Sequence, residues 1–228
     1  MERDFYNDLI KNFYVEDKNV FRFGSIDDGG YYLKPNTILE ADILFSGGIS
    51  SNLEFEFDLF RFNKDIKVFM VDPTVSTLKL SAKSILRIFL GKKERIRYLY
   101  NTLLFIYMTR TNRCWHINKW LSKENKIFDI IAEKVKLEKG SKIILKLDIE
   151  GSEYELLEEI ENNLELFTSL IFEFHDLDKK NEIAYNFIEK CYSKFDIVYI
   201  GINEVGGYDK NRRPKIIEVS LERKVALN

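Results

Sequence analysis

The chain alternates short apolar runs with helical patterns, and this alternation constrains its fold more than any other feature. Nearly continuous apolar strands that alternate with helices are typical of a mostly parallel sheet covered on both faces. The sequence therefore predicts an α/β fold with a central sheet between two helical layers. The apolar runs are 41–48, 66–72, 141–149 and 169–175, and the helical segments that follow them are 52–62, 74–90, 153–164 and 181–195.

The two ends of the chain have different patterns. Residues 195–204 and 215–223 are apolar segments joined by a turn-rich loop, which predicts an antiparallel hairpin at the edge of the sheet. Residues 1–40 are predicted to form an N-terminal cap, with a short helix and then an Asp-Asp-Gly-Gly turn between aromatic segments. We expect residues 41–228 to form a single globular domain behind this cap.

The middle of the chain has a less regular pattern. Residues 95–105 fit either a strand or a helix, whereas 115–134 have a helical pattern. The stretch 79–113 is predominantly basic, and such runs are usually solvated helix faces, which is the interpretation we favour. The alternative is a surface for anionic substrates or lipid headgroups, which would allow peripheral membrane contact.

The bulk composition excludes several classes of protein. The chain is 45% hydrophobic, so we expect one sizeable core. Its 35 Lys+Arg nearly balance its 37 Asp+Glu, so the net charge argues neither for nor against a nucleic-acid partner, and we expect none. Cys114 and Cys191 lie in no Cys/His cluster, which argues against a disulfide or zinc site and favours a cytoplasmic setting. We expect neither a signal peptide nor a transmembrane segment, because no apolar run is long enough. Nothing in the sequence indicates the oligomeric state.

Small and acidic residues follow the first two predicted strands. Ser46, Gly47 and Gly48 end the first apolar run, and Asp72 ends the second. Ligands of open parallel sheets bind beyond the carboxyl ends of the strands. Glycines there let a ligand approach the backbone, and an acid after the second strand typically hydrogen-bonds the ribose of an adenosine ligand. This order of features indicates a nucleoside-binding edge.

The third predicted strand ends in a group of acids. Ser152 and Glu155 fit a capping box, and Glu153 is also favourable near a helix N-terminus, so we interpret these residues as the start of a helix. Asp148 and Glu150 precede the cap and are not explained by it. Because carboxylates are costly to bring together at a buried strand end, we consider both as candidates for a functional site.

Two further groups leave a choice open. His175 follows the fourth predicted strand and is either a strand-end residue bonded to a neighbouring backbone group or a member of the acidic site. Arg22, Asp28 and Tyr31 belong either to a packed cap loop or to a loop that closes over a ligand.

The segment ILKLDIEGSEYELL (144–157) closely resembles the signature of FkbM-type S-adenosylmethionine-dependent methyltransferases. The family's order of segments is also present in this chain, with ILFSGGISSNLEFEFDLF, VFMVDPT and LIFEFH. In addition, RFGSIDDGGYYL and the C-terminal tail are similar to elements of a bacterial subgroup. The resemblance covers most of the chain except about 75–135. It implies a class I methyltransferase fold, a Rossmann-like three-layer sandwich whose seven-stranded sheet has an antiparallel last strand.

The resemblance also implies a methyl donor, S-adenosylmethionine, and an acceptor hydroxyl on a sugar, glycan or related small molecule. It implies that Ser46, Gly47 and Gly48 line the methionine part of the donor and that Asp72 holds its ribose. Asp148 would face both the donor and the reacting centre. The loop after the first strand departs from the family, which has an acid followed by Gly-x-Gly at this place.

Methyl transfer to a hydroxyl needs a group that takes the hydroxyl proton. We hypothesise that Asp148 or His175 is this general base and that Glu150 orients the acceptor. The family-like pattern around Arg22, Asp28 and Tyr31 favours substrate binding for these three residues. A divalent cation held by Asp148, Glu150 and His175 is a less favoured variant. Two other functions remain alternatives: a nucleotide-dependent oxidoreductase, although no G-x-G-x-x-G follows the first strand, and a non-catalytic binding module.

Overall fold

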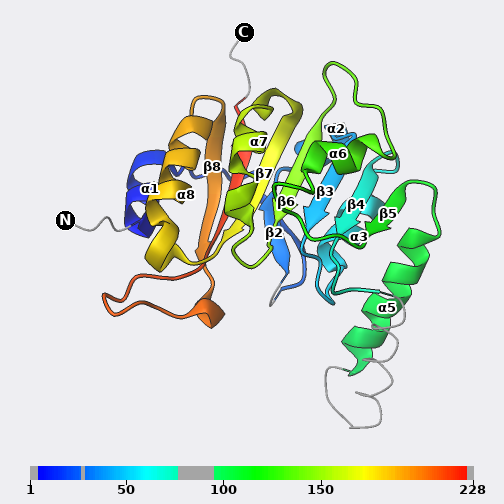
Figure 1. Ribbon diagram of the computed structural model, residues 1–228, viewed down its shortest axis with the longest axis horizontal. Helices are drawn as coiled ribbons and strands as arrows, with labels where there is room; N and C mark the ends of the chain where they lie inside the picture. The colour runs from blue at the N-terminus through cyan, green and yellow to red at the C-terminus, as the bar shows by residue number, and fades with distance from the viewer. Residues whose placement is uncertain (1–4, 27–28, 77–94, 225–228) are drawn as a thin grey trace.

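The core of the structure is a seven-stranded sheet (Figure 1). The computed structural model describes residues 5–26, 29–76 and 95–224. Five neighbouring strands run parallel, and β9 runs antiparallel to the strand on each side of it. The α/β fold class and the antiparallel C-terminal hairpin are therefore confirmed. In spatial order the strands are β5 (Cys114–Ile117), β4 (Lys67–Val71), β3 (Ile43–Gly47), β6 (Ile143–Leu147), β7 (Phe167–Phe174), β9 (Ile217–Arg223) and β8 (Phe195–Ile202).

Helices cover both faces of this sheet. The helices of one face bury residues such as Leu9, Ile130 and Phe187 in a common core with the strands, and those of the other face bury Leu59 and Phe105. The first group consists of α1 (Phe5–Phe13), α6 (Ile127–Ala132), α7 (Leu157–Glu161) and α8 (Leu177–Cys191), and the second of α2 (Pro35–Glu40), α3 (Glu54–Phe62) and α5 (Arg95–Thr109). Single 3-10 turns lie at η1 (Glu153–Glu155), η2 (Leu164–Leu166) and η3 (Glu204–Gly206).

The middle of the chain differs in part from expectation. The helical pattern of 115–134 holds only in part, because Cys114–Ile117 form the edge strand β5 and, within this stretch, only Ile127–Ala132 form an α-helix. A strand of four residues is too short to show a period of its own, and its pairing with β4 decides its conformation. Residues 95–105 belong to helix α5. Most of the helix predicted over 74–90, and the basic stretch up to residue 94, lie outside the described residues.

A short hairpin joins the N-terminal segment to the face that carries α3. Strands β1 (Phe21–Gly24) and β2 (Gly30–Leu33) pair antiparallel. The Tyr31 ring is buried edge-on against Phe55 of α3, with 5.0 Å between the ring centroids. The next residue, Tyr32, stacks on Tyr199 of β8 at 3.9 Å. The hairpin thereby brings Tyr31 to the carboxyl end of the parallel strands. Among the helices in the described ranges, none is long and apolar enough to cross a membrane.

Candidate active site

Charged side chains gather beyond the carboxyl ends of β6 and β7. Successive side chains of a strand point to opposite faces, so Lys146 and Asp148 share one face, and Glu173 and His175 share one face of the next strand. The parallel register of β6 and β7 places Asp148 beside Glu173. This is the face covered by α3 and the β1–β2 hairpin, where Tyr31 lies. Strand register thus assembles four chemically active groups from two segments.

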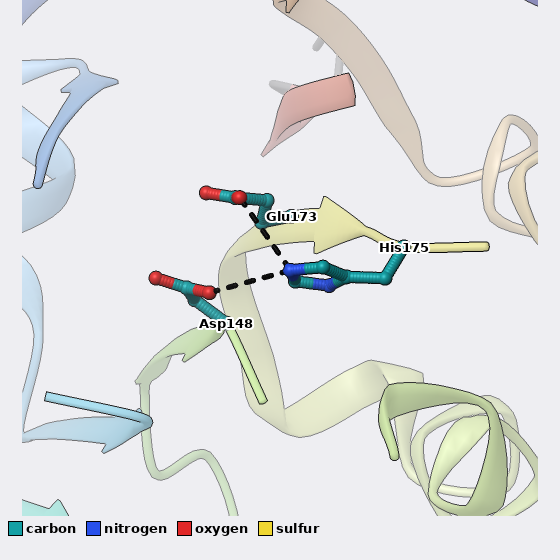
Figure 2. Close-up of side chains that lie close together, drawn as sticks. All are labelled: Asp148, Glu173 and His175. Atoms are coloured by element: carbon teal, nitrogen blue, oxygen red, sulfur yellow. Dashed lines mark ion pairs between the residues drawn. The ribbon is translucent and has the colours of Figure 1, made fainter. Parts of the chain in front are cut away.

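Three carboxylates surround the Nε2 atom of His175. Figure 2 shows the ring turned toward its neighbours, with Nε2 3.5 Å from Oε1 of Glu173 and 3.9 Å from Oδ1 of Asp148. Glu150 is largely exposed, and its Oε2 lies 3.7 Å from the same nitrogen. Asn203 donates a hydrogen bond of 2.9 Å to Oε1 of Glu173. The structure therefore brings Asp148, Glu150 and His175 together, and their roles stay a prediction.

The opposite side of the His175 ring is held by Glu153, which is completely buried. Its Oε1 accepts the backbone N–H of His175 at 2.8 Å and lies 3.3 Å from the ring Nδ1, while its Oε2 accepts the N–H of Gly151 at 2.9 Å. Because a carboxylate only accepts hydrogen bonds, this contact assigns the donor role, and therefore a proton, to Nδ1. Glu153 therefore orients the imidazole.

The predicted capping box is wrong. The Ser152 side chain makes no capping hydrogen bond, and Glu155 accepts the N–H of Lys123 at 3.4 Å. The chain turns through left-handed conformations at Glu150 and Gly151, with φ of 55° and 96°. This turn directs Glu153 back toward β7, so its carboxylate serves His175 rather than a helix terminus.

Charge coupling decides the protonation of this cluster. Burial lowers the pKa of His175, but the hydrogen bond and charge of Glu153, with the charges of Glu173 and Asp148, outweigh burial and raise it to about 9. Burial and the charge of Asp148 raise the pKa of Glu173 to about 8. The cluster therefore retains a proton at neutral pH, which we place on His175 because the charges of Glu153, Glu173 and Asp148 favour the imidazolium.

Two donors hold the other oxygen of Asp148. The Tyr31 hydroxyl donates to Oδ2 at 3.1 Å, and Nζ of Lys146 lies 3.6 Å from the same oxygen. Lys146 is buried and also donates to the carbonyl oxygen of Gly48. Burial, together with the charge of Asp148, raises the pKa of Tyr31 well above its usual value. Tyr31 therefore stays a neutral phenol donor.

Two cavities meet at Gly48, Ser50 and Asp148. The larger, about 260 Å³, is also lined by Asp72, Trp120 and Leu121. The smaller, about 180 Å³, also has Tyr31, Asn52, Glu56, Arg97 and Lys146 in its wall. Gly48 has a φ of 76°, and a Cβ there would lie 1.6 Å from the carbonyl oxygen of Asp148. Only glycine fits at this junction.

Two other predicted donor-binding residues, Ser46 and Gly47, are not among the residues that line the two cavities. Ser46 is buried within β3, and its hydroxyl donates to Oε1 of Glu56 at 2.5 Å. A Cβ on Gly47 would lie 2.5 Å from Cδ1 of Leu121, so this glycine admits the Leu121 side chain. Ser46 and Gly47 therefore contact residues of the cavity walls, Glu56 and Leu121, whereas Gly48 lines both cavities itself.

Asp72 ties two loops together at the wall of the larger cavity. Its Oδ2 accepts the N–H of Ser50 at 2.9 Å, and its Oδ1 accepts from the N–H and hydroxyl of Thr74 at 2.7 and 2.6 Å. Each carboxylate oxygen offers two lone pairs. The loops after β3 and β4 are therefore fixed around an acid that retains acceptor capacity.

The three predicted substrate residues have different positions. Tyr31 lies in the site, whereas Asp28 lies outside the described residues. Arg22 is in β1, where its Nε donates to the carbonyl of Ser25 at 2.9 Å and its guanidinium lies 5.5 Å from the centroid of the Tyr32 ring. A substrate role for Arg22 stays a prediction.

Sequence reasoning missed four charged residues of this site: Glu56, Lys146, Glu153 and Glu173. Lys146 and Glu173 had a recognisable signal, since each interrupts an apolar strand two residues before a candidate, and a period of two predicts a shared face. Glu153 matched a helix-start pattern, which indicated a role at a helix N-terminus and not in the site. Glu56 is buried by tertiary packing, which the charged helix pattern does not indicate.

The cluster also contains donors suited to a metal ion. Asp148, Glu173 and His175 each offer one ligand atom, and these atoms lie within 4.8 Å of one another. Carboxylate oxygens and an imidazole nitrogen are common ligands of divalent cations. These residues, rather than the set with Glu150, could hold such an ion after small side-chain movements.

No protein-family model and no curated protein sequence matches the chain. Among solved structures, a precorrin-6y C5,15-methyltransferase from Geobacter metallireducens is 8% identical, with a TM-score of 0.44 over 92% of this chain and 94% of that chain. A putative rRNA methylase from Clostridium thermocellum is 12% identical, with a TM-score of 0.44 over 99% and 98%. A methyltransferase FkbM from Methylobacillus flagellatus is 16% identical, with a TM-score of 0.40 over 79% of this chain and 44% of that chain.

Proposed function

We propose that the chain is an S-adenosylmethionine-dependent O-methyltransferase of FkbM type that acts on a hydroxyl of a sugar, glycan or related small molecule. The observation that carries this proposal is the meeting of two unlike cavities at Gly48 and Asp148. S-adenosylmethionine joins a nucleoside to an amino acid through a sulfonium. A nucleoside suits the larger cavity, with Trp120 and Asp72, and an amino acid suits the polar smaller cavity.

The residues around Asp148 suit a methyl transfer to oxygen. The acceptor oxygen would attack the methyl carbon, the carbon–sulfur bond would break with its electrons passing to sulfur, and the hydroxyl proton would pass to a base. Because His175 already holds a proton at neutral pH, we assign the base to Asp148. A carboxylate suffices because the attacking oxygen becomes strongly acidic as its bond to the methyl carbon forms.

The neighbours of Asp148 would position its carboxylate and the acceptor, and would not themselves take part in the reaction. Tyr31 and Lys146 hold Oδ2, which leaves Oδ1 for the acceptor. Exposed Glu150, at the rim of the larger cavity, would orient the acceptor. Alignment of donor and acceptor would supply much of the rate. If a divalent cation at Asp148, Glu173 and His175 instead acidified the hydroxyl, thorough chelation would abolish activity.

Calorimetry with S-adenosylhomocysteine tests the proposal. The wild type should bind, and Asp72→Ala should weaken binding by about tenfold or more, because each lost hydrogen bond to the ribose contributes about 1 kcal/mol. Asp65→Ala is the matched control, since Asp65 is an exposed acid at the opposite end of β4. Absence of binding to the wild type, or tight binding of a reduced nicotinamide nucleotide in its place, would refute the proposal.

A second experiment separates binding from chemistry. Asp148→Asn should bind S-adenosylhomocysteine within a few-fold of the wild type but transfer no methyl group to any acceptor that the wild type uses. Retained transfer would remove Asp148 as the base.

A further inference from the structure

We propose that Glu56 binds the α-ammonium group of the methyl donor's amino-acid part. This inference rests on the proposed function and deepens it. Glu56 lies in the first turn of α3 and is 1% exposed, yet it is part of the wall of the smaller cavity. Within the described residues, its Oε2 is the one buried side-chain polar atom without a hydrogen-bond partner.

An unpaired buried carboxylate oxygen needs an explanation. The other carboxylate oxygen of Glu56, Oε1, accepts a hydrogen bond of 2.5 Å from the hydroxyl of Ser46, and this bond fixes the orientation of the carboxylate. Burial raises the pKa of Glu56, and the charge of Lys146 opposes this shift. Burying a carboxylate without full compensation is costly, so such a group is expected where a ligand supplies the missing donor.

The neighbouring Lys146 has other partners. Its ammonium donates to the Gly48 carbonyl and faces Asp148 at 3.6 Å. The positive charge of Lys146 therefore reduces the free-energy cost of the buried negative charge on Glu56 without a hydrogen bond to it. Oε2 of Glu56 is left for a donor that enters the cavity. An ammonium group with three N–H donors is suited to that position.

The opposite sign of charge is present in the same cavity. Arg97 of α5 contributes to the wall and is held by Ser25, whose hydroxyl it contacts at 2.9 Å, and by Glu54 at 3.5 Å. A cavity with a carboxylate and a guanidinium in its wall complements a zwitterion, which carries both an ammonium and a carboxylate. The ligand class indicated by these residues is therefore a free α-amino acid group.

Binding of the amino-acid part can be tested with two ligands that have the same nucleoside and differ in whether they carry an amino acid. S-adenosylhomocysteine carries the amino-acid part, whereas 5′-methylthioadenosine lacks it. Glu56→Gln has nearly the same shape and can keep the bond to Ser46. We expect this variant to lower the affinity for S-adenosylhomocysteine by about ten- to a hundredfold, as for a lost charge-assisted hydrogen bond. Its affinity for methylthioadenosine should stay within about twofold of the wild type.

Several results would overturn the inference. If Glu56→Gln binds S-adenosylhomocysteine as tightly as the wild type, or loses the same factor of affinity for both ligands, a specific contact with the ammonium group is excluded. Glu40→Gln, an exposed acid on α2 paired with Lys142, is the control and should change neither affinity. If the wild type binds neither ligand, the proposed function itself is wrong, which is a distinct outcome.

A measurement on the wild type alone guards against a variant that does not fold. S-adenosylhomocysteine whose α-amino group is acetylated has no charge there and fewer donors. Its affinity should fall by about tenfold or more relative to the unmodified ligand. Equal affinity of the two compounds would refute a role for any carboxylate, Glu56 included, at the ammonium.

Discussion

Replacing Glu153 with glutamine should lower the pKa of His175. The carboxylate of Glu153 accepts from Nδ1 of the ring and is buried with it, and its hydrogen bond and charge are the two largest causes that raise this pKa. In Glu153→Gln the charge is lost, while burial continues to disfavour the imidazolium. We therefore expect the pKa of His175 to fall from about 9 by about 1–3 units.

The corresponding free energies follow from the same contacts. A rise from 6.5 to about 9 corresponds to about 3 kcal/mol in favour of the imidazolium in the folded protein. Because the folded pKa lies above the unfolded one, this contribution is fully present below about pH 6.5 and is lost as the pH rises through about 9. A fall of about 1–3 units corresponds to about 1–4 kcal/mol, so Glu153→Gln should reduce the free energy of unfolding at pH 6 by that amount, and by less at pH 10.

Nuclear magnetic resonance of the histidine Cε1–H groups measures this pKa directly. The chain has only two histidines, His116 and His175, so a His116→Gln variant assigns both signals. Burial lowers the pKa of His116, which separates the two titrations. Glu155→Gln is the matched control, because Glu155 lies in the same turn and is exposed. A His175 midpoint that is the same in Glu153→Gln and wild type would refute the reasoning.

Three other predictions concern pH and backbone geometry. Methyl transfer by the wild type should decline as the pH rises through about 9, because the His175 imidazolium beside Asp148 is lost; a rate that rises there would make His175 the base. Burial raises the pKa of Glu222 to about 7, so the folded state holds its proton more tightly and the free energy of unfolding should fall by about 3 kcal/mol between pH 4.5 and 7. Glu222→Gln should flatten that dependence in urea titrations, and an unchanged slope would contradict it. Gly48→Ala should lower the free energy of unfolding by more than about 1 kcal/mol and abolish donor binding, because of its positive φ and the clash with Asp148; a normal melting temperature with normal calorimetric binding would contradict this.

Local pattern was sufficient for most of the fold. Apolar strands followed by segments with helical periodicity indicate a sheet that is buried on both faces, and this pattern can be recognised in each segment on its own. The parallel strands around Ile43–Gly47 and the C-terminal hairpin were therefore predictable. The edge strand at Cys114–Ile117 was not, because its four residues acquire their conformation from pairing with β4.

The chemistry of the site depended on tertiary structure. Sequence placed Asp148 at a strand end, but the register of β6 against β7 brought Glu173 and His175 to it. Glu153 matched a helix-start pattern and instead became the buried partner of His175. The physical reason is that periodicity reports how deeply a side chain is buried, whereas its charge state and role depend on neighbours that are distant in the chain.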